Sequence, residues 1–333
     1  MFSKMKTKWL VGIFSILLVL SVIALISSNS KSTISRNRTF KSELTDFDTT
    51  KVTQIYIYPK MKKEAIILSK SGEDWKVAVG DKKYNADPNS IRGMISTLLN
   101  LRATRLAAND KSQWAQYEVT DSAASRVQLI EGKKTVVDLY LGKFSYQQPK
   151  NMNPYNYQQQ GKMTSYVRLA GDKEVYAVEG LIAMSFNRQA GDFRNRTIIR
   201  SNKESWNRLA FTGPDKTFNL VKQGDKWIID GMMADSATVV KYLSSLAWLS
   251  NSNFVEESVM SSDKPLYTLS IEGENLPSPI RVSAFPADTT NKYAIGSSLN
   301  EGAFFSGSSN GLFEKIFVGS DYFFPVSKEA KEH

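Results

Sequence analysis

Residues 68–77 read LSKSGEDWKV and residues 220–229 read LVKQGDKWII. Each stretch places a leucine and a lysine before a glycine, then an acidic residue and a tryptophan that precedes apolar residues. Alternating residues on both sides of a glycine turn predict a β-hairpin. Trp75 and Trp227 bring a large apolar area, and we predict that they anchor a core rather than contact a ligand. The chain is therefore predicted to build one hairpin twice.

A helix follows each hairpin. Asp87 and Asp235 are suited to cap the helix N-termini, and Pro88 to occupy the first helical position. Apolar residues then recur on one helical face with the same spacing from the cap. They are Ile91, Ile95, Leu98 and Leu101 in the first helix, and Val239, Leu243, Leu246 and Leu249 in the second. This agreement indicates an internal duplication.

The predicted fold class is α+β, with an N-terminal transmembrane helix followed by two tandem similar units, each a mainly antiparallel sheet with a packed helix. The units are expected to end in short helices at 180–186 and 311–317, and to pack as a pair or join loosely through 187–205. The predicted segments are a cytoplasmic tail (1–8), a transmembrane anchor (9–26), a linker (27–50), the two units (51–190 and 191–325) and a C-terminal tail (326–333).

The segment 9–26, WLVGIFSILLVLSVIALI, contains no charged residue and is long enough as a helix to cross most of a hydrocarbon core. A cleaved signal peptide is the alternative, but its apolar region is normally shorter and ends in a small-x-small site. Lys4, Lys6 and Lys8 precede the segment and favour a cytoplasmic N-terminus. We expect a single-pass protein of a bacterial inner membrane, with most of the chain extracytoplasmic, or periplasmic in a Gram-negative source.

Composition excludes several chemistries. The chain has no cysteine, and its only histidine is His333, so thiolate sites and Ser-His-Asp catalysis are excluded. No P-loop motif occurs, so the chain is not an ATPase of that type. The net charge of +10 lies largely around the apolar segment, and no nucleic-acid-binding motif accompanies it. We predict a protein that is not an enzyme, with no catalytic residue, metal site or cofactor and no nucleic-acid partner.

Carboxylates leave one enzymatic alternative, because a hydrolase acting on glycosides needs only two acids at a defined separation. Most of the candidates have structural explanations. Asp74 and Asp225 are expected in turns, and Asp87 and Asp235 at helix caps. Glu256 and the adjacent Glu257 are expected on a solvated face. A carboxylate-dependent hydrolase is therefore the least favoured function.

Residues 192–200, DFRNRTIIR, concentrate arginine. On a strand, Arg194, Arg196 and Arg200 share one face. One interpretation is a site for phosphate, carboxylate or an acidic partner. The other is a solvated or internally paired strand face between the two units, and we favour this second interpretation.

A second candidate surface lies in residues 144–166, which are rich in tyrosine, asparagine and glutamine and have no counterpart of similar length in the second half. We predict a long loop, in which Tyr146, Tyr155 and Tyr157 suit a glycan or a protein partner. A flexible connection without a ligand is the alternative.

The anchor, GEDWKV (72–77), NADPNSIRGMISTLLNLRATRL (85–106), YVRLAGDKEVYAV (166–178) and FRNRTI (193–198) together resemble the DUF4340 family of bacterial membrane-anchored proteins. The family usually has an aromatic-glycine-leucine piece after the first helix. Here QYEVTD (116–121) places Glu118 where glycine is expected, so no turn geometry is transferred there.

The resemblance implies a role beside ABC-type membrane proteins, because such chains are often encoded with a permease, its ATPase and a gliding-motility-like auxiliary subunit. We therefore expect an accessory or scaffold subunit of an ABC-transporter-like complex, anchored in the lipid bilayer by residues 9–26. The alternative is a periplasmic module that binds a glycan or another envelope polymer. The resemblance supplies no catalytic residues.

Overall fold

The computed structural model describes residues 40–60, 64–148, 161–215 and 217–324. Within these residues, no helix has the length and apolar composition needed to cross a membrane. The predicted anchor at 9–26 lies outside the described residues. Residues from Glu43 onward belong to one compact unit, which contains both predicted copies.

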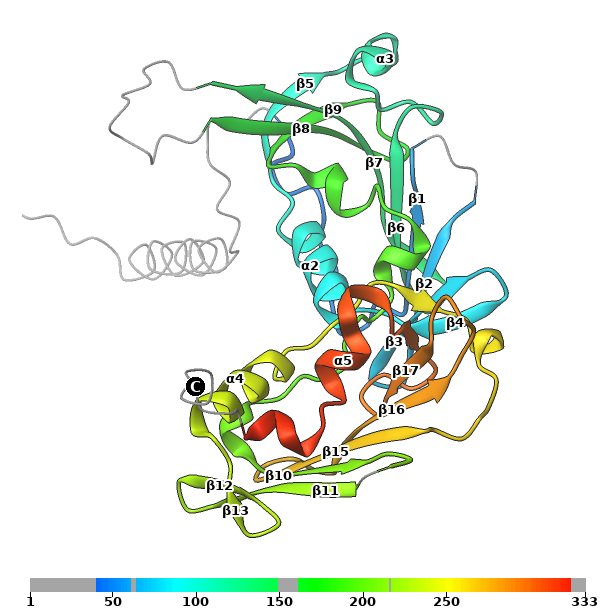
Figure 1. Ribbon diagram of the computed structural model, residues 1–333. Helices are drawn as coiled ribbons and strands as arrows, with labels where there is room; N and C mark the ends of the chain where they lie inside the picture. Colours follow the sequence, from blue (N-terminus) through cyan, green and yellow to red (C-terminus); the bar gives the residue numbers. More distant parts are fainter. Residues whose placement is uncertain (1–39, 61–63, 149–160, 216, 325–333) are drawn as a thin grey trace, which may run out of the picture. The chain divides into compact units, whose positions relative to one another are not determined.

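The first copy is a nine-stranded sheet in which every paired strand is antiparallel to its neighbour (Figure 1). The strand order is β4-β3-β2-β1-β6-β7-β8-β9-β5. The strands are β1 (Gln54–Tyr58), β2 (Ile66–Ser71), β3 (Asp74–Val79), β4 (Lys82–Asn85), β5 (Ala103–Ala108), β6 (Ser125–Glu131), β7 (Lys134–Gln147), β8 (Lys162–Leu169) and β9 (Val175–Glu179).

The second copy repeats this topology, with strand order β13-β12-β11-β10-β15-β16-β17-β18-β14. Its strands are β10 (Trp206–Thr212), β11 (Thr217–Gln223), β12 (Lys226–Ile229), β13 (Met232–Met233), β14 (Phe254–Val255), β15 (Tyr267–Gly273), β16 (Ile280–Pro286), β17 (Tyr293–Ser297) and β18 (Phe304–Ser306). Because each strand occupies the place of its counterpart, the predicted tandem of antiparallel units is confirmed.

The two matching sequence stretches form β2–β3 and β11–β12. Gly72 and Gly224 take positive φ values of 63° and 59° at the turns, a conformation that glycine adopts without a steric penalty. Trp227 is buried, whereas Trp75 is only partly buried. The predicted core role is therefore confirmed for Trp227, whereas Trp75 lies at the margin of its core.

Helices α2 (Pro88–Leu99) and α4 (Ser236–Leu246) follow β4 and β13. Asp87 accepts hydrogen bonds from the backbone N–H groups of Asn89 and Ser90, and Asp235 accepts one from Thr238. Both predicted caps are therefore confirmed. The helices pack against the equivalent strands β3 and β12. The buried faces are Ile91, Met94 and Leu98 in α2, and Val239, Tyr242, Leu243 and Leu246 in α4.

Short helices complete both copies. They are η1 (Lys111–Gln113), α3 (Trp114–Tyr117), η2 (Ile182–Ser185), η3 (Ala190–Phe193), η4 (Lys203–Ser205), η5 (Glu257–Val259), η6 (Ser309–Gly311), α5 (Leu312–Ile316) and η7 (Ser320–Phe323). The predicted short helices correspond to η2 and α5. Each is followed by a further turn, η3 or η7, that ends on a fully buried phenylalanine, Phe193 or Phe323.

Equivalent backbone contacts show where each copy starts and ends. Leu44 donates its N–H to Leu101 O (3.2 Å) near the start of the first copy, and Ile198 donates to Leu249 O (2.9 Å) in the second. At the ends, Phe193 O and Phe323 O accept hydrogen bonds from the helix caps. Leu44 is 2% exposed, so the linker predicted at 27–50 is too long at its C-terminal end.

A helical segment between β5 and β6, residues 111–121, packs on the first sheet. Arg168 attaches it to the sheet, since its guanidinium lies 3.8 Å from the Trp114 ring centre and 4.0 Å from that of Tyr140. Arg168 also donates to Val119 O (3.0 Å) and to Asp121 (3.1 Å). These contacts satisfy a charged side chain that is almost fully buried.

Candidate functional site

The arginine segment does not form the predicted strand. Within 192–200, only Arg194 and Thr197 make isolated β-bridges, and these bridges go to different partners, Ala86 and Ser250. A strand face needs a continuous ladder, which this segment lacks. The predicted common face is accordingly wrong: Arg194 is buried, Arg196 is partly exposed and Arg200 is exposed.

The same segment connects the two copies through its backbone. Asn195 donates its N–H to Asn85 O (2.7 Å) in the first copy. In the second copy, Asn300 donates its side-chain amide to Asn195 O (2.7 Å), and Asn251 donates to Arg196 O (3.0 Å). Asn300 also accepts from the Asn85 side chain at 3.3 Å. The segment is thereby fixed on both sides, which holds the arginines in defined positions.

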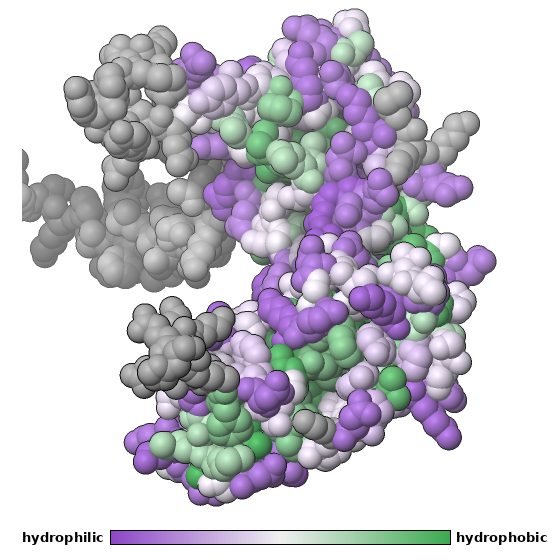
Figure 2. Space-filling view, in the orientation of Figure 1, coloured by the Kyte–Doolittle hydropathy of each residue, from purple (hydrophilic) through white to green (hydrophobic). Residues whose placement is uncertain are grey.

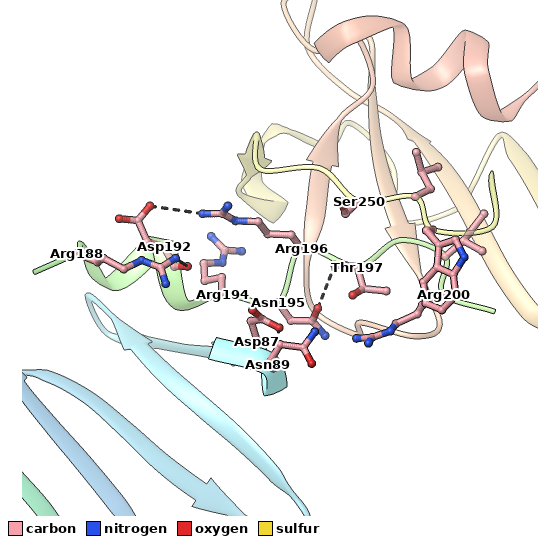
Figure 3. A pocket seen from close by; sticks show the side chains of 13 residues that line it. Asp87, Asn89, Arg188, Asp192, Arg194, Asn195, Arg196, Thr197, Arg200 and Ser250 are labelled. Carbon is pink, nitrogen blue, oxygen red and sulfur yellow. Dashed lines mark hydrogen bonds and ion pairs between the residues drawn. The ribbon is translucent and has the colours of Figure 1, made fainter. Parts of the chain in front are cut away.

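The three predicted arginines nevertheless line one pocket of about 360 Å³. A fourth arginine, Arg188, joins them (Figure 3). The remaining lining residues come from the start of α2, from the connecting segment and from the end of α4: Asp87, Asn89, Asp192, Asn195, Thr197, Ile199, Trp248, Leu249 and Ser250. We call this site the arginine pocket.

Arg194 is held between two aromatic rings. Its guanidinium carbon lies 3.6 Å from the Tyr84 ring centre and 3.7 Å from that of Phe254. The residue is 6% exposed, and its Nε and Nη2 atoms are buried without a hydrogen-bond partner among the described residues. Burial lowers the pKa of Arg194, but arginine remains protonated in proteins.

Arg188 and Arg196 are partly engaged. Arg196 lies 3.5 Å from the Asp192 carboxylate, with both side chains about two-fifths exposed, which makes this a weak ion pair. Arg188 donates to the backbone oxygen of Asp192 (2.7 Å) and lies 4.8 Å from the Phe193 ring centre. Asp192 also accepts from the Gln189 N–H, so its charge is shared.

Arg200 and Trp248 form the exposed end of the pocket. The guanidinium of Arg200 lies 5.8 Å from the Trp248 ring, and the tryptophan is 68% exposed. In Figure 3, the Arg200 side chain extends toward the asparagines of the pocket. The sequence prediction did not include Arg188, which lies just before residues 192–200, or Trp248, which is distant from them in the sequence. Trp248 directly precedes Leu249, which was predicted in the core, and the sequence does not distinguish this exposed tryptophan from the buried ones.

A polar contact beside Arg194 joins β4 to the residue after β14. Glu256 pairs with Lys82 at 2.8 Å and accepts a hydrogen bond from the Tyr84 hydroxyl at 3.0 Å. The hydrogen bonds from Lys82 and Tyr84 lower the pKa of Glu256, and the reciprocal bond from Glu256 raises that of Lys82. Glu256 is exposed as predicted, but it contacts the other copy rather than solvent alone.

Tyr146 lies at a separate place, on the hairpin β7–β8. The predicted loop at 144–166 is shorter than expected, since β7 runs to Gln147 and β8 starts at Lys162. Tyr146 pairs with Met163 across the hairpin and is 51% exposed. Tyr155 and Tyr157 lie outside the described residues.

Two antiparallel sheets of equal topology, with an arginine pocket lined by residues of both copies, define a duplicated α+β protein. A model of the family described as Domain of unknown function (DUF4340) matches residues 75–150 and 156–270, more than half of the chain. The chain belongs to this family, as the sequence resemblance predicts. No curated protein and no solved structure matches it.

Proposed function

We propose that the chain is a non-enzymatic, single-pass protein of a bacterial inner membrane, anchored by residues 9–26. Its extracytoplasmic part acts as an accessory or scaffold subunit of an ABC-transporter-like complex, with the permease or an auxiliary membrane subunit as its partner. The apolar N-terminal segment supports the anchor. The duplicated sheets supply a rigid framework, so partner binding is assigned to features in which the copies differ.

The observation that carries this proposal is the exposed apolar face of the β7–β8 hairpin. Phe144 and Tyr146 are two positions apart on β7, so their side chains lie on the same face of the hairpin. Met163 is directly opposite Tyr146 on β8 and lies on that face too. Their exposed fractions are 56%, 51% and 38%. In the second copy, the equivalent β16–β17 pairing ends already at Pro286 and Tyr293. An extended hairpin with exposed aromatic residues is a surface typical of partner binding.

Co-purification tests this proposal. The tagged full chain is extracted from membranes of its source with mild detergent, and we expect ABC-type permease and ATPase subunits to be recovered with it. The variant F144S/Y146S/M163S is expected to lose them. Recovery of the chain alone, or equal recovery with the variant, contradicts the proposal.

A matched control is available in the second copy. Met232, Met233 and Leu266 are 58%, 59% and 40% exposed, similar to the hairpin residues. Apolar surface is visible in the region of β12 and β13 in Figure 2. The variant M232S/M233S/L266S changes surface hydrophobicity to a similar extent, and we expect it to retain the partners.

A second candidate is a module that binds a glycan or another envelope polymer. Exposed Tyr146 favours it, because tyrosine offers a flat apolar ring and a hydroxyl to a sugar. Binding to isolated cell-wall polymer that is lost on deletion of 146–162 supports this candidate. Binding that survives the deletion rejects a role for the tyrosine-rich segment.

A further inference from the structure

The arginine pocket is lined by four arginines and by two carboxylates, those of Asp87 and Asp192, so most of its positive charge is not neutralised within the pocket. Asp87 is occupied at the start of α2, where its two oxygens accept hydrogen bonds from Asn89 N and from the backbone and hydroxyl of Ser90. Asp192 binds Gln189 N and pairs weakly with Arg196. Among the described residues, Arg188, Arg194 and Arg200 have no carboxylate within 4.0 Å.

Arg194 supplies independent evidence for a ligand. It lines the pocket, is more than nine-tenths buried and has two nitrogen atoms without an acceptor in the described part of the chain. A buried donor without an acceptor is unfavourable, and native proteins rarely retain one without a water, an ion or a ligand. Arg196 Nε is in the same condition. Both residues line the pocket, so an oxyanion bound there lies next to arginines whose donors lack an acceptor among the described residues.

We infer that the pocket binds a phosphate or carboxylate group carried on a small saccharide. The planar guanidinium groups of arginine match the paired oxygens of either anion. The exposed ring of Trp248, next to Arg200, offers an apolar face to a sugar ring. Asn89, Asn195 and Ser250 add neutral hydrogen-bonding groups for hydroxyls.

The size of the pocket agrees with this class of ligand. Small-molecule sites start at about 300 Å³, so a pocket of about 360 Å³ accommodates a monosaccharide that bears one anionic group. An inorganic anion leaves much of this space unfilled. Because the lining comes from α2 and from the end of α4, the ligand contacts both copies. Binding should therefore stabilise the folded chain against heat.

The inference does not depend on the accessory role proposed above, and calorimetry with the full chain in detergent tests it separately. The probes are glucose 6-phosphate, glucuronate, inorganic phosphate and glucose. We expect the first two to bind, with a higher melting temperature and an affinity that falls as salt rises. Inorganic phosphate should bind more weakly, and glucose should not bind.

Variants assign the site. Arg200→Gln removes an exposed side chain and should weaken binding roughly tenfold or more, because a hydrogen bond to a charged group is lost. Trp248→Ala should weaken the binding of glucose 6-phosphate more than the binding of inorganic phosphate. The control is Arg102→Gln, which changes an exposed residue outside the pocket, and this variant should bind as the unmodified chain does.

Each remaining outcome overturns the inference. If none of the anions binds, or if Arg200→Gln binds as tightly as the unmodified chain, the pocket is not an oxyanion site. If inorganic phosphate binds as tightly as the sugar phosphate, the saccharide is rejected. If an acidic peptide binds and both sugars fail, the ligand is a protein segment instead.

Discussion

The guanidinium carbon of Arg194 lies 3.6 Å from the ring centre of Tyr84, although the two residues belong to segments that are more than one hundred positions apart. Tyr84 is in β4, at the edge of the first sheet, and Phe254, on the other side of Arg194, is in β14 of the second sheet. One buried cation thus joins the two copies, and the arginine pocket lies beside it.

Two substitutions of Arg194 distinguish the effect of its charge on stability from the effect of its packing. Arg194→Met removes two cation–π contacts, worth about 0.5–2 kcal/mol each, but also removes buried unpaired donors that cost about 1–3 kcal/mol. We expect its free energy of unfolding to stay within about 1 kcal/mol of the unmodified chain. Arg194→Ala should lose at least about 2 kcal/mol through the cavity that it leaves. Chemical denaturation measures both, and equal losses contradict this account.

The Glu256 contact predicts a pH dependence. Its pKa is lowered on folding from an ordinary value of 4.5, so its stabilising effect is present above that pH and is lost as the pH falls through the folded pKa. We expect Glu256→Gln to melt at a lower temperature than the unmodified chain at neutral pH. Below pH 4.5, this difference should shrink. The neighbouring Glu257→Gln serves as the control, and a pH-independent difference for Glu256→Gln excludes the ionised contact.

Glu118 occupies a conformation that favours glycine. Its φ is 55°, at the C-terminal end of α3. A left-handed backbone costs a non-glycine residue about 1–2 kcal/mol. Glu118→Gly should therefore be more stable than Glu118→Ala by about 1 kcal/mol, since both lose the ion pair with Lys60. Thermal unfolding compares the two variants directly. If the alanine variant is the more stable, the backbone at residue 118 is not strained.

Gly142 allows the 111–121 segment to approach the first sheet. A Cβ at this position overlaps the backbone oxygen of Tyr117 and lies 2.7 Å from Val119 Cγ1. Gly142→Ala should destabilise the fold by about 1–3 kcal/mol. Gly93→Ala is the matched control, because it meets open space inside α2 and should stabilise by up to about 1 kcal/mol. Similar effects of the two changes contradict the close approach.

The duplication was predictable because its signals are local. Gly72, Gly224, Asp87 and Asp235 each act within a few residues, at a turn or at a helix start, and short-range patterns report such positions directly. The shared order of elements in the two copies followed from these local matches, whereas the strand order came from the structure. The contacts that place one copy against the other are non-local and carry no comparable pattern.

The arginine pocket was predictable only in part. The cluster of arginines at 194–200 was visible in the sequence, and its alternation suggested a strand. That strand does not form, because the segment makes only isolated bridges, one to Ala86 in the first copy and one to Ser250 in the second. Arg188 and Trp248 enter the pocket through tertiary structure. Because residues 144–166 are polar, the sequence predicted a loop where the outer parts of β7 and β8 form. Strands pair through their backbones, so an exposed hairpin can carry polar side chains.

Site-specific photocrosslinking tests the accessory role most directly. A photoreactive residue replaces Tyr146 on the hairpin in the full chain, and a control chain carries it in place of Met232 in β13. Irradiation in native membranes should join position 146 to an ABC-type permease or auxiliary membrane subunit, with no such product at position 232. If position 146 gives no membrane-protein product, or the same products as position 232, the hairpin is not the partner-binding surface.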